Sequence, residues 1–212
     1  EVLLKPMTET QWMIRVIKPA VFMLCLAPAA WLLWDGLTRH LGANPVETLN
    51  HRTGIWTLRL LLITLTVTPL RRLTGWNNLI RLRRMLGLYV FFYACLHFLT
   101  WSVFDHFFDV HEIVKDIIKR PYITVGFLAF VLLIPLAVTS TKTWVKRLGS
   151  RWARLHRLVY VIATGGVLHF LWLVKADVRE PVVYGSILAV LLAYRAWRRR
   201  SMPLPIGRMV RQ

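Results

Sequence analysis

Six long apolar segments constrain the fold of this chain more than any other feature of its sequence. A helix needs about 20 mainly apolar residues to cross a bilayer, and each segment approaches that length. The segments are continuously apolar, whereas the strands of a membrane barrel alternate apolar and polar residues over shorter runs. We therefore expect an all-α polytopic membrane protein built as a six-helix transmembrane bundle. The expected spans are 16–34, 55–70, 85–104, 123–139, 155–174 and 182–197.

Two of the expected spans carry unusual features. The second is short and contains Arg59, which makes it the weakest of the six. In the first, the stretch "APAA" at 27–30 resembles a signal-peptide cleavage site. Its apolar region is longer than the roughly 7 to 15 residues of a signal peptide, which favours a membrane span. The spans leave no stretch for a second folded domain, so we expect a single domain over residues 1–212.

The net charge of +18 is distributed unevenly between the loops. Residues 105–120 and 175–180 mix acidic and basic side chains, whereas the alternate loops are strongly basic. Lys and Arg are enriched in short cytoplasmic loops, so this pattern predicts that both termini are cytoplasmic. Topology thus explains the charge, and we expect a lipid bilayer as the partner and no nucleic acid. The basic residues are Arg71, Arg72, Arg81, Arg83, Arg84, Lys142, Lys146, Arg147, Arg151, Arg154, Arg195, Arg198, Arg199 and Arg200.

Several common site motifs are absent from the sequence. Cys25 and Cys95 fall within expected spans and form no CxxC pair, so we expect no structural disulfide. The chain has no GxGxxG, Walker or HExxH motif, which argues against a nucleotide fold or a zinc hydrolase site.

Three of the seven histidines lie at membrane depth, where an ionisable side chain is costly unless a partner or a bound group compensates it. His97 follows Arg84 by thirteen residues and His169 follows Arg154 by fifteen, so both rise about 20 Å from the inner boundary. Two imidazoles at one height on the third and fifth spans could bind one haem b between them. The alternative is that each bonds a carbonyl or hydroxyl group across the bundle. We expect solvated surface positions for His40, His51, His106 and His111.

His156 is the third histidine, and it lies near the expected cytoplasmic face, only two residues after Arg154. The matching height on the third span holds Arg83 and Arg84 instead of a histidine, so a second haem would need another ligand. We expect His156 to serve the side where electrons arrive, either as ligand of a weaker second haem or as a contact to flavin or quinone. A structural bond to the backbone at the helix start is the alternative.

Six separated stretches, in order along the chain, resemble one family of membrane proteins. They are "LGANPVETLNHRTG", "TVTPLRR", "RRMLGL", "RPYITVGF", "WARLHRLVY" and "HFLWLVKAD". The stretches are similar to the haem-binding membrane subunit of the bacterial periplasmic methionine-sulfoxide reductase system, the MsrQ (YedZ) family. That family lies within the larger ferric-reductase-like transmembrane family, in which electrons pass outward through haem b.

The resemblance implies an electron-transfer subunit of the bacterial inner membrane and not a complete enzyme. It implies a periplasmic molybdopterin-containing reductase that repairs oxidised methionine as partner, and a quinone pool or a cytosolic flavin reductase as electron donor. It also implies one or two haem b groups and flavin mononucleotide (FMN), with His97, His156 and His169 carried over as haem residues. The inner histidine that larger oxidases have on span three is absent here, which argues against a second bis-histidine haem.

The negatively charged groups of the implied cofactors need basic residues on the same side of the membrane. Flavin phosphate could contact Arg71, Arg72, Arg83 or Arg84 on the inner side, and haem propionates could contact Arg52, Arg59 or Lys175 on the outer side. Contact with lipid head groups is the alternative for the inner arginines. Two other functions stay open: a self-contained transmembrane metalloreductase, and a proton-coupled transporter in which the histidines relay protons.

Overall fold

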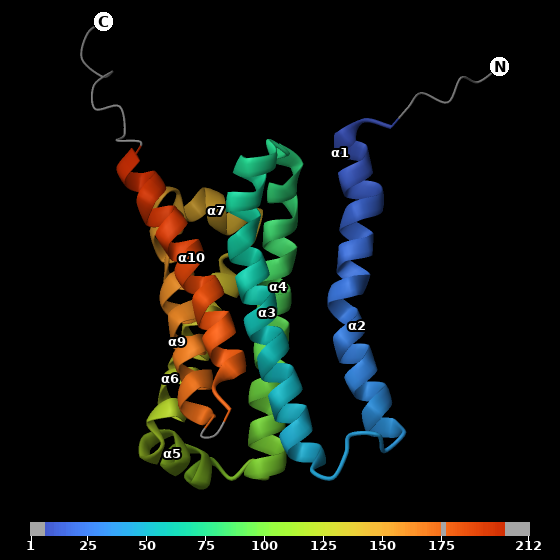
Figure 1. Ribbon diagram of the computed structural model, residues 1–212, viewed down its shortest axis with the longest axis vertical. Helices are drawn as coiled ribbons and strands as arrows, with labels where there is room; N and C mark the ends of the chain where they lie inside the picture. Colours follow the sequence, from blue (N-terminus) through green and yellow to red (C-terminus); the bar gives the residue numbers. More distant parts are fainter. Residues whose placement is uncertain (1–6, 175–176, 202–212) are drawn as a thin grey trace, which may run out of the picture.

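The computed structural model describes residues 7–174 and 177–201, and regular secondary structure within these ranges is entirely helical (Figure 1). A π-helical segment at Met13–Ile17 joins α1 to α2, and another at Trp101–Asp105 extends α4. A short 3-10 turn at Asn77–Leu79 precedes α4. The α-helices are α1 (Glu9–Trp12), α2 (Lys18–Leu37), α3 (Pro45–Thr74), α4 (Ile80–Thr100), α5 (Val110–Lys119), α6 (Pro121–Val138), α7 (Lys142–Leu148), α8 (Ser150–Leu155), α9 (Leu158–Leu173) and α10 (Arg179–Ser201).

Five helical stretches among the described residues are long and apolar enough to cross a membrane. The prediction of an all-α, multi-pass membrane protein is thereby confirmed. The expected sixth span corresponds to α10, which runs beside α9 (Figure 1) but carries Arg195, Arg198 and Arg200 in its last two turns. The count of six spans therefore stays a prediction. The five stretches are Glu9–Leu37, Pro45–Thr74, Asn77–Asp105, Pro121–Val138 and Ser150–Leu173.

The helix α3 is the centre of the bundle and is much longer than the expected second span. It packs along α4 and also contacts α2, α9 and α10. Half of the residues in its apolar part are buried, among them Leu58, Leu61 and Leu65. Asn44 caps its first turn by accepting a bond from the Glu47 amide, so the helix starts about ten residues before the apolar run.

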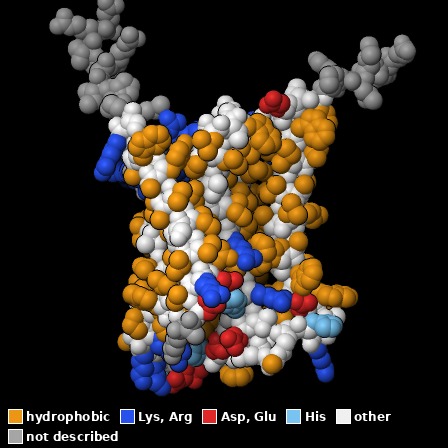
Figure 2. Space-filling view, in the orientation of Figure 1, with side chains coloured by type: hydrophobic (Ala, Val, Ile, Leu, Met, Phe, Trp, Pro, Cys, Tyr) orange, Lys and Arg blue, Asp and Glu red, His pale blue; other side chains and the backbone are white. Residues whose placement is uncertain are grey.

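The two ends of the bundle differ in character. We call the end that carries the α3–α4 turn and α7 the basic end, and the opposite end the α5 end (Figure 1). Gly75 ends α3 in the left-handed conformation with φ of 71°, which lets the chain reverse into α4. In the space-filling view, Lys and Arg side chains lie at the upper left, toward the basic end, apolar side chains cover much of the middle, and acidic, basic and histidine side chains are mixed toward the α5 end (Figure 2).

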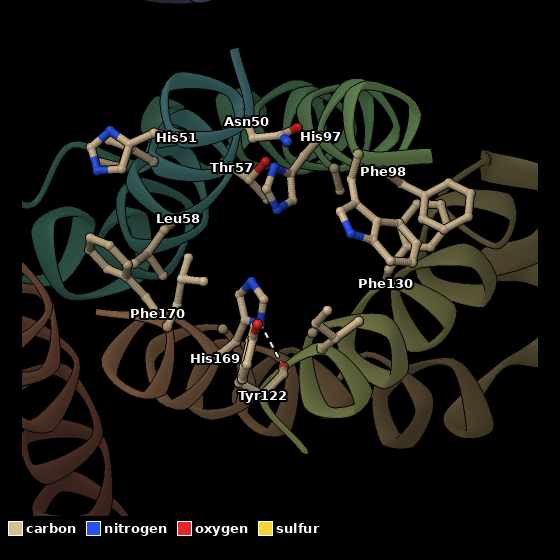
Figure 3. A pocket seen from close by; sticks show the side chains of 18 of the residues that line it. Asn50, His51, Thr57, Leu58, His97, Phe98, Tyr122, Phe130, His169 and Phe170 are labelled. Atoms are coloured by element: carbon tan, nitrogen blue, oxygen red, sulfur yellow. Dashed lines mark hydrogen bonds between the residues drawn. The ribbon is translucent and has the colours of Figure 1, made fainter. Parts of the chain in front are cut away.

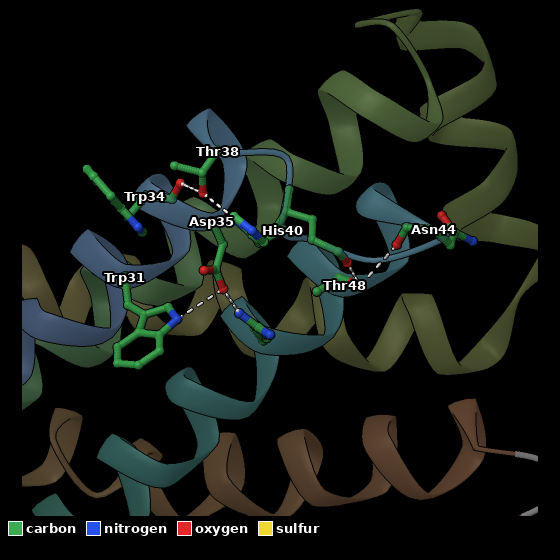
Figure 4. A network of polar contacts seen from close by, with 9 residues as sticks. Trp31, Trp34, Asp35, Thr38, His40, Asn44 and Thr48 are labelled. Carbon is green, nitrogen blue, oxygen red and sulfur yellow. Dashed lines mark hydrogen bonds and ion pairs between the residues drawn. The ribbon is translucent and has the colours of Figure 1, made fainter.

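The helix α2 stands beside α3 and α4 and is fastened to them by polar contacts. The Tyr93 hydroxyl accepts from the Ala29 amide at 3.0 Å and donates to the Cys25 carbonyl at 2.8 Å, so it bridges one turn of α2. The Tyr89 hydroxyl donates to the Phe22 carbonyl at 3.0 Å. Near the α5 end, Asp35 pairs with Arg52 of α3 and accepts from Trp31 Nε1 at 3.0 Å (Figure 4).

Candidate functional site

A cavity of about 920 Å³ lies between α3, α4, α6 and α9 (Figure 3), and its mouth is at the α5 end, where Glu47, Asp105 and Arg120 line it. Its size is in the range of pockets that hold small molecules and cofactors. The deeper walls are apolar, whereas the mouth carries Asn50, His51 and Arg120. The apolar walls include Ile55, Leu58, Leu61, Phe98, Phe127, Phe130, Leu133, Ile162 and Phe170.

His97 of α4 and His169 of α9 point toward each other across this cavity (Figure 3). Their ring centroids are 6.2 Å apart and the rings are inclined at 72°. A bond from an imidazole nitrogen to a metal is about 2 Å long, so two imidazoles on opposite sides of one metal have centroids roughly 6 Å apart. The structure therefore places His97 and His169, which the sequence predicts at the same membrane depth, at a separation that suits one metal centre.

Each of the two imidazoles is held through its Nδ1 atom. The Nδ1–H of His169 donates to the Tyr122 carbonyl at 2.7 Å, since a carbonyl oxygen only accepts. The Nδ1 of His97 lies 3.2 Å from Thr53 Oγ1, whose own hydrogen is directed to the Leu49 carbonyl at 2.7 Å. Thr53 therefore accepts from His97. Both neutral rings keep their Nε2 lone pair free for a ligand bond, with orientation fixed from behind.

Two glycines let these rings lie directly against neighbouring helices. A Cβ at Gly126 of α6 would lie 2.7 Å from His169 Nδ1, closer than side-chain carbons approach other atoms. A Cβ at Gly54 of α3 would lie 3.1 Å from His97 Cε1. We call the surface that these two glycines form behind the imidazoles the histidine cradle. It depends on the absence of a Cβ at Gly54 and Gly126.

The cation at the cavity mouth is Arg120, which the sequence analysis did not single out. It precedes α6 and is the one Lys or Arg among the described residues that line the cavity. Its Nε donates to Asp116 Oδ1 at 2.8 Å, and the side chain is 55% exposed. The sequence signal that could have found it is the position of an arginine directly before an apolar span, in "RPYITVGF".

The three expected propionate contacts lie elsewhere. Arg52 is paired with Asp35 on the side of α3 that faces α2. Arg59 donates from Nε to the Tyr184 hydroxyl at 2.8 Å and lies over the Trp56 ring at 5.2 Å, so it faces α10. Neither is among the residues that line the cavity. Lys175 lies outside the described residues.

His156 lies away from the cavity, at the break between α8 and α9. Its Nε2 is 3.0 Å from Thr139 Oγ1, and that hydroxyl donates to the Pro135 carbonyl at 2.6 Å, so Nε2–H donates to Thr139. The ring also stacks on Trp152 with centroids 4.1 Å apart. His156 Nε2 therefore bonds the Thr139 hydroxyl, whereas the structural alternative in the sequence analysis expects a bond to the backbone at the helix start.

The four inner arginines lie on both sides of the α3–α4 turn. Arg71 and Arg72 are in the last turns of α3, and Arg83 and Arg84 are in the first turns of α4. Arg84 lines a groove between α2 and α4, in which the other three take no part.

The outer histidines differ in exposure. His40 and His111 are exposed, as expected, and the exposed His51 also lines the cavity mouth. The expectation for His106 is wrong: its side chain is 14% exposed and its Nε2 is 3.2 Å from Asp116 Oδ2. The carboxylate of a neighbouring helix explains why this polar ring lies inside.

Comparisons with known proteins agree with this architecture. The ferric reductase like transmembrane component model matches residues 53–167, which include α4, α6 and most of α9. A relative from Herminiimonas arsenicoxydans, named protein-methionine-sulfoxide reductase heme-binding subunit MsrQ, is 58% identical over 194 residues, 89% of each chain. Relatives of that name from Xanthomonas oryzae and Xanthomonas campestris are 51% and 54% identical, over 92% and 87% of each chain. No solved structure matches the chain. By these matches over most of its length, the chain belongs to the MsrQ family, within the ferric-reductase-like transmembrane proteins.

Proposed function

We propose that this chain is the haem b electron-transfer subunit of a methionine-sulfoxide reductase system and that His97 and His169 are the axial haem ligands. The observation that carries the proposal is the pair of facing imidazoles, 6.2 Å apart, inside an apolar cavity. Haem supplies one-electron redox chemistry when bound, and an apolar slot with two fixed imidazoles suits its flat ring. The relatives' shared name, which includes heme binding, supports haem as the cofactor.

Arg120 is the residue we assign to a haem propionate. Arg120 lines the cavity mouth, where its Nε donates to Asp116 and one terminal nitrogen lies 3.4 Å from the Tyr122 hydroxyl, so the guanidinium is positioned and keeps donors for an anion. A carboxylate placed there gains a charge-assisted bond. This assignment replaces Arg52 and Arg59, which are engaged elsewhere.

The partner and the direction of transfer complete the proposal. If His97 and His169 both held the haem iron, no iron position would remain for a substrate, so we assign the reduction of methionine sulfoxide to a separate, periplasmic molybdopterin-containing reductase. The cavity opens at the α5 end, which we assign to the periplasm of a bacterial inner membrane. Electrons come from the quinone pool or a cytosolic flavin reductase at the basic end, where FMN and His156 take part.

A metalloreductase is the second candidate, because the cavity mouth also carries carboxylates. Glu47, Asp105 and Asp177 line it and could attract an external metal cation. Reoxidation assays separate the two candidates. The reduced protein should be reoxidised rapidly by the molybdopterin reductase together with methionine sulfoxide. Ferric chelates should reoxidise it only slowly. Fast reoxidation by ferric chelates alone would favour the metalloreductase.

The haem assignment is tested by spectroscopy of single variants. We expect the purified protein to give a b-type pyridine haemochrome and a low-spin reduced spectrum. His97→Ala and His169→Ala should each abolish the low-spin spectrum, because each removes one axial nitrogen, while His111→Ala on the exposed surface should keep it. An unchanged spectrum in both cavity variants would overturn the assignment.

A further inference from the structure

A second groove, of about 650 Å³, lies between α2 and α4 at the basic end. Lys18, Arg81 and Arg84 line it together with apolar and aromatic side chains. Lys18 is the first residue of α2, and the two arginines lie in the first turns of α4, so the three cations gather at the outer edge of the groove. The other lining residues lie deeper along the two helices: Phe22, Leu26, Met85, Leu88, Tyr89 and Phe92.

The charge at this edge is not compensated within the described part of the chain. No described carboxylate lies within ion-pair distance of the three cations. Arg81 uses its Nε to donate to Asn78 Oδ1 at 3.2 Å, which leaves its terminal nitrogens available. The groove therefore attracts an anion to its outer edge.

The deeper part of the groove has the length and the chemistry of one membrane leaflet. From Lys18 to Leu26, and from Arg84 to Phe92, the helices rise about 12 Å, and one leaflet of hydrocarbon is about 15 Å thick. Phe22, Leu88 and Phe92 remain 45%, 38% and 39% exposed, so the walls are reachable from the bilayer side. An occupant with one anionic end and a long apolar body fits these dimensions.

We propose that this groove binds one acidic phospholipid. Lys18, Arg81 and Arg84 hold its anionic headgroup, and its acyl chains lie along the apolar walls. Basic pockets between membrane helices on the cytoplasmic side are suited to such headgroups. The lipid occupies the groove beside the Tyr89 and Tyr93 hydroxyls, which link α4 to α2 by hydrogen bonds to Phe22, Cys25 and Ala29.

The lining chemistry favours a lipid over a flavin or a quinone. Both ring systems carry polar atoms that need hydrogen-bond partners along their length. Tyr89 is the one uncharged polar side chain of the lining, and its hydroxyl is already used by the Phe22 carbonyl. The groove thus offers cations at one end and apolar contacts elsewhere.

The proposal is tested by native mass spectrometry of the full chain taken from nanodiscs of equal parts dioleoyl phosphatidylglycerol and dioleoyl phosphatidylcholine. We expect one phosphatidylglycerol to stay bound per chain. The triple variant Lys18→Gln/Arg81→Gln/Arg84→Gln should lower its retention about a hundredfold, since each cation near an anionic surface contributes roughly a factor of five. The matched control Arg72→Gln/Lys146→Gln/Arg151→Gln removes the same charge from exposed positions outside the groove and should retain the lipid.

A further variant tests the apolar slot itself. Leu88→Trp keeps all three cations but fills the groove, so it should also lose the lipid, and circular dichroism checks that each variant keeps its helices. Equal loss of phosphatidylglycerol in the two triple variants would mean that the overall positive charge, and not the groove, retains the lipid. That result would overturn the proposal. Full retention in Leu88→Trp, or displacement of the lipid by added FMN, would overturn it as well.

Discussion

The orientation of His97 and His169 is decided by a few atoms behind each ring. Thr53 and the Tyr122 carbonyl hold the Nδ1 atoms, and Gly54 and Gly126 let the rings lie against the neighbouring helices. None of these contacts is apolar packing, so each depends on one specific residue or carbonyl group. The site should therefore be sensitive to changes that hardly affect the hydropathy of the chain.

Gly126→Ala is the sharpest single test of this cradle. The added methyl group would lie 2.7 Å from His169 Nδ1, so the ring must move and its bond to Tyr122 must lengthen. Overpacking of this kind costs about 1–3 kcal/mol, so haem retention should fall by about fivefold or more. The haem-to-protein ratio after purification measures it.

Gly87→Ala is the matched control for that experiment. Gly87 lies within α4, and a Cβ there would meet no atom within 4 Å apart from its chain neighbours and the nearby backbone of its own helix. Replacing a helical glycine by alanine stabilises a helix by about 1 kcal/mol, so this variant should keep its haem and melt no earlier. Equal haem content in Gly126→Ala and Gly87→Ala would contradict the role of Gly126 in positioning His169.

Depth counting from the sequence found the pair of facing histidines but not the residues around them. A rise of 1.5 Å per residue is regular enough to match heights on two helices. Which residue faces the cavity depends on the rotation of each helix, and the near-uniform apolarity of the spans does not encode it. Arg59 was therefore assigned to the cavity although it faces α10, and Arg120 was missed.

At the scale of helices, hydropathy located five of the six expected spans among the described residues, but not their ends. The helix α3 begins at Pro45 because Asn44 caps it, although residues 45–54 are largely polar. The expected fifth span is interrupted between Leu155 and Leu158, where His156 and Arg157 separate α8 from α9. Backbone hydrogen bonding sets these boundaries, and it continues or stops independently of the apolar run.

The attachment of α2 through Tyr93 gives a prediction for one helix. Tyr93→Phe removes both bonds that its hydroxyl makes to Ala29 and Cys25, which should destabilise the contact by about 1–2 kcal/mol. Cys25 is 6% exposed in that contact, so its alkylation by N-ethylmaleimide, in a Cys95→Ala background, should become faster.

Tyr194→Phe is the control for this measurement, because Tyr194 lies on α10, where its ring is near Trp197, and Cys25 lies on α2, so the alkylation rate should stay unchanged. An unchanged rate in Tyr93→Phe would show that apolar packing alone holds α2 in place.

The whole molecule separates a basic end from an end of mixed charge, and this asymmetry predicts its orientation. In a Cys25→Ala/Cys95→Ala background, His111→Cys at the start of α5 should react with an impermeant maleimide added outside the cells, and Asn77→Cys in the α3–α4 turn should not. Both positions are exposed, so access across the membrane decides the result. Labelling of Asn77→Cys alone would reverse the topology.

Transfer across the molecule should require His156, which lies toward the basic end, thirteen residues before His169. Its imidazole donates to the Thr139 hydroxyl and stacks on the Trp152 ring. Because it lies outside the cavity, His156→Ala should leave the low-spin spectrum intact while slowing reduction by the physiological donor. Dithionite, which needs no donor site, should still reduce the protein fully.

The control for this last variant is Thr139→Val, which removes the hydroxyl that accepts from His156 but keeps the imidazole. If the ring itself serves the electron donor, Thr139→Val should be slowed less than His156→Ala. If His156 only fastens α8 to the end of α6, both variants should lose thermal stability alike and be reduced at the wild-type rate. Loss of part of the haem in His156→Ala would instead make it a ligand of a second haem, because the cavity pair does not depend on it.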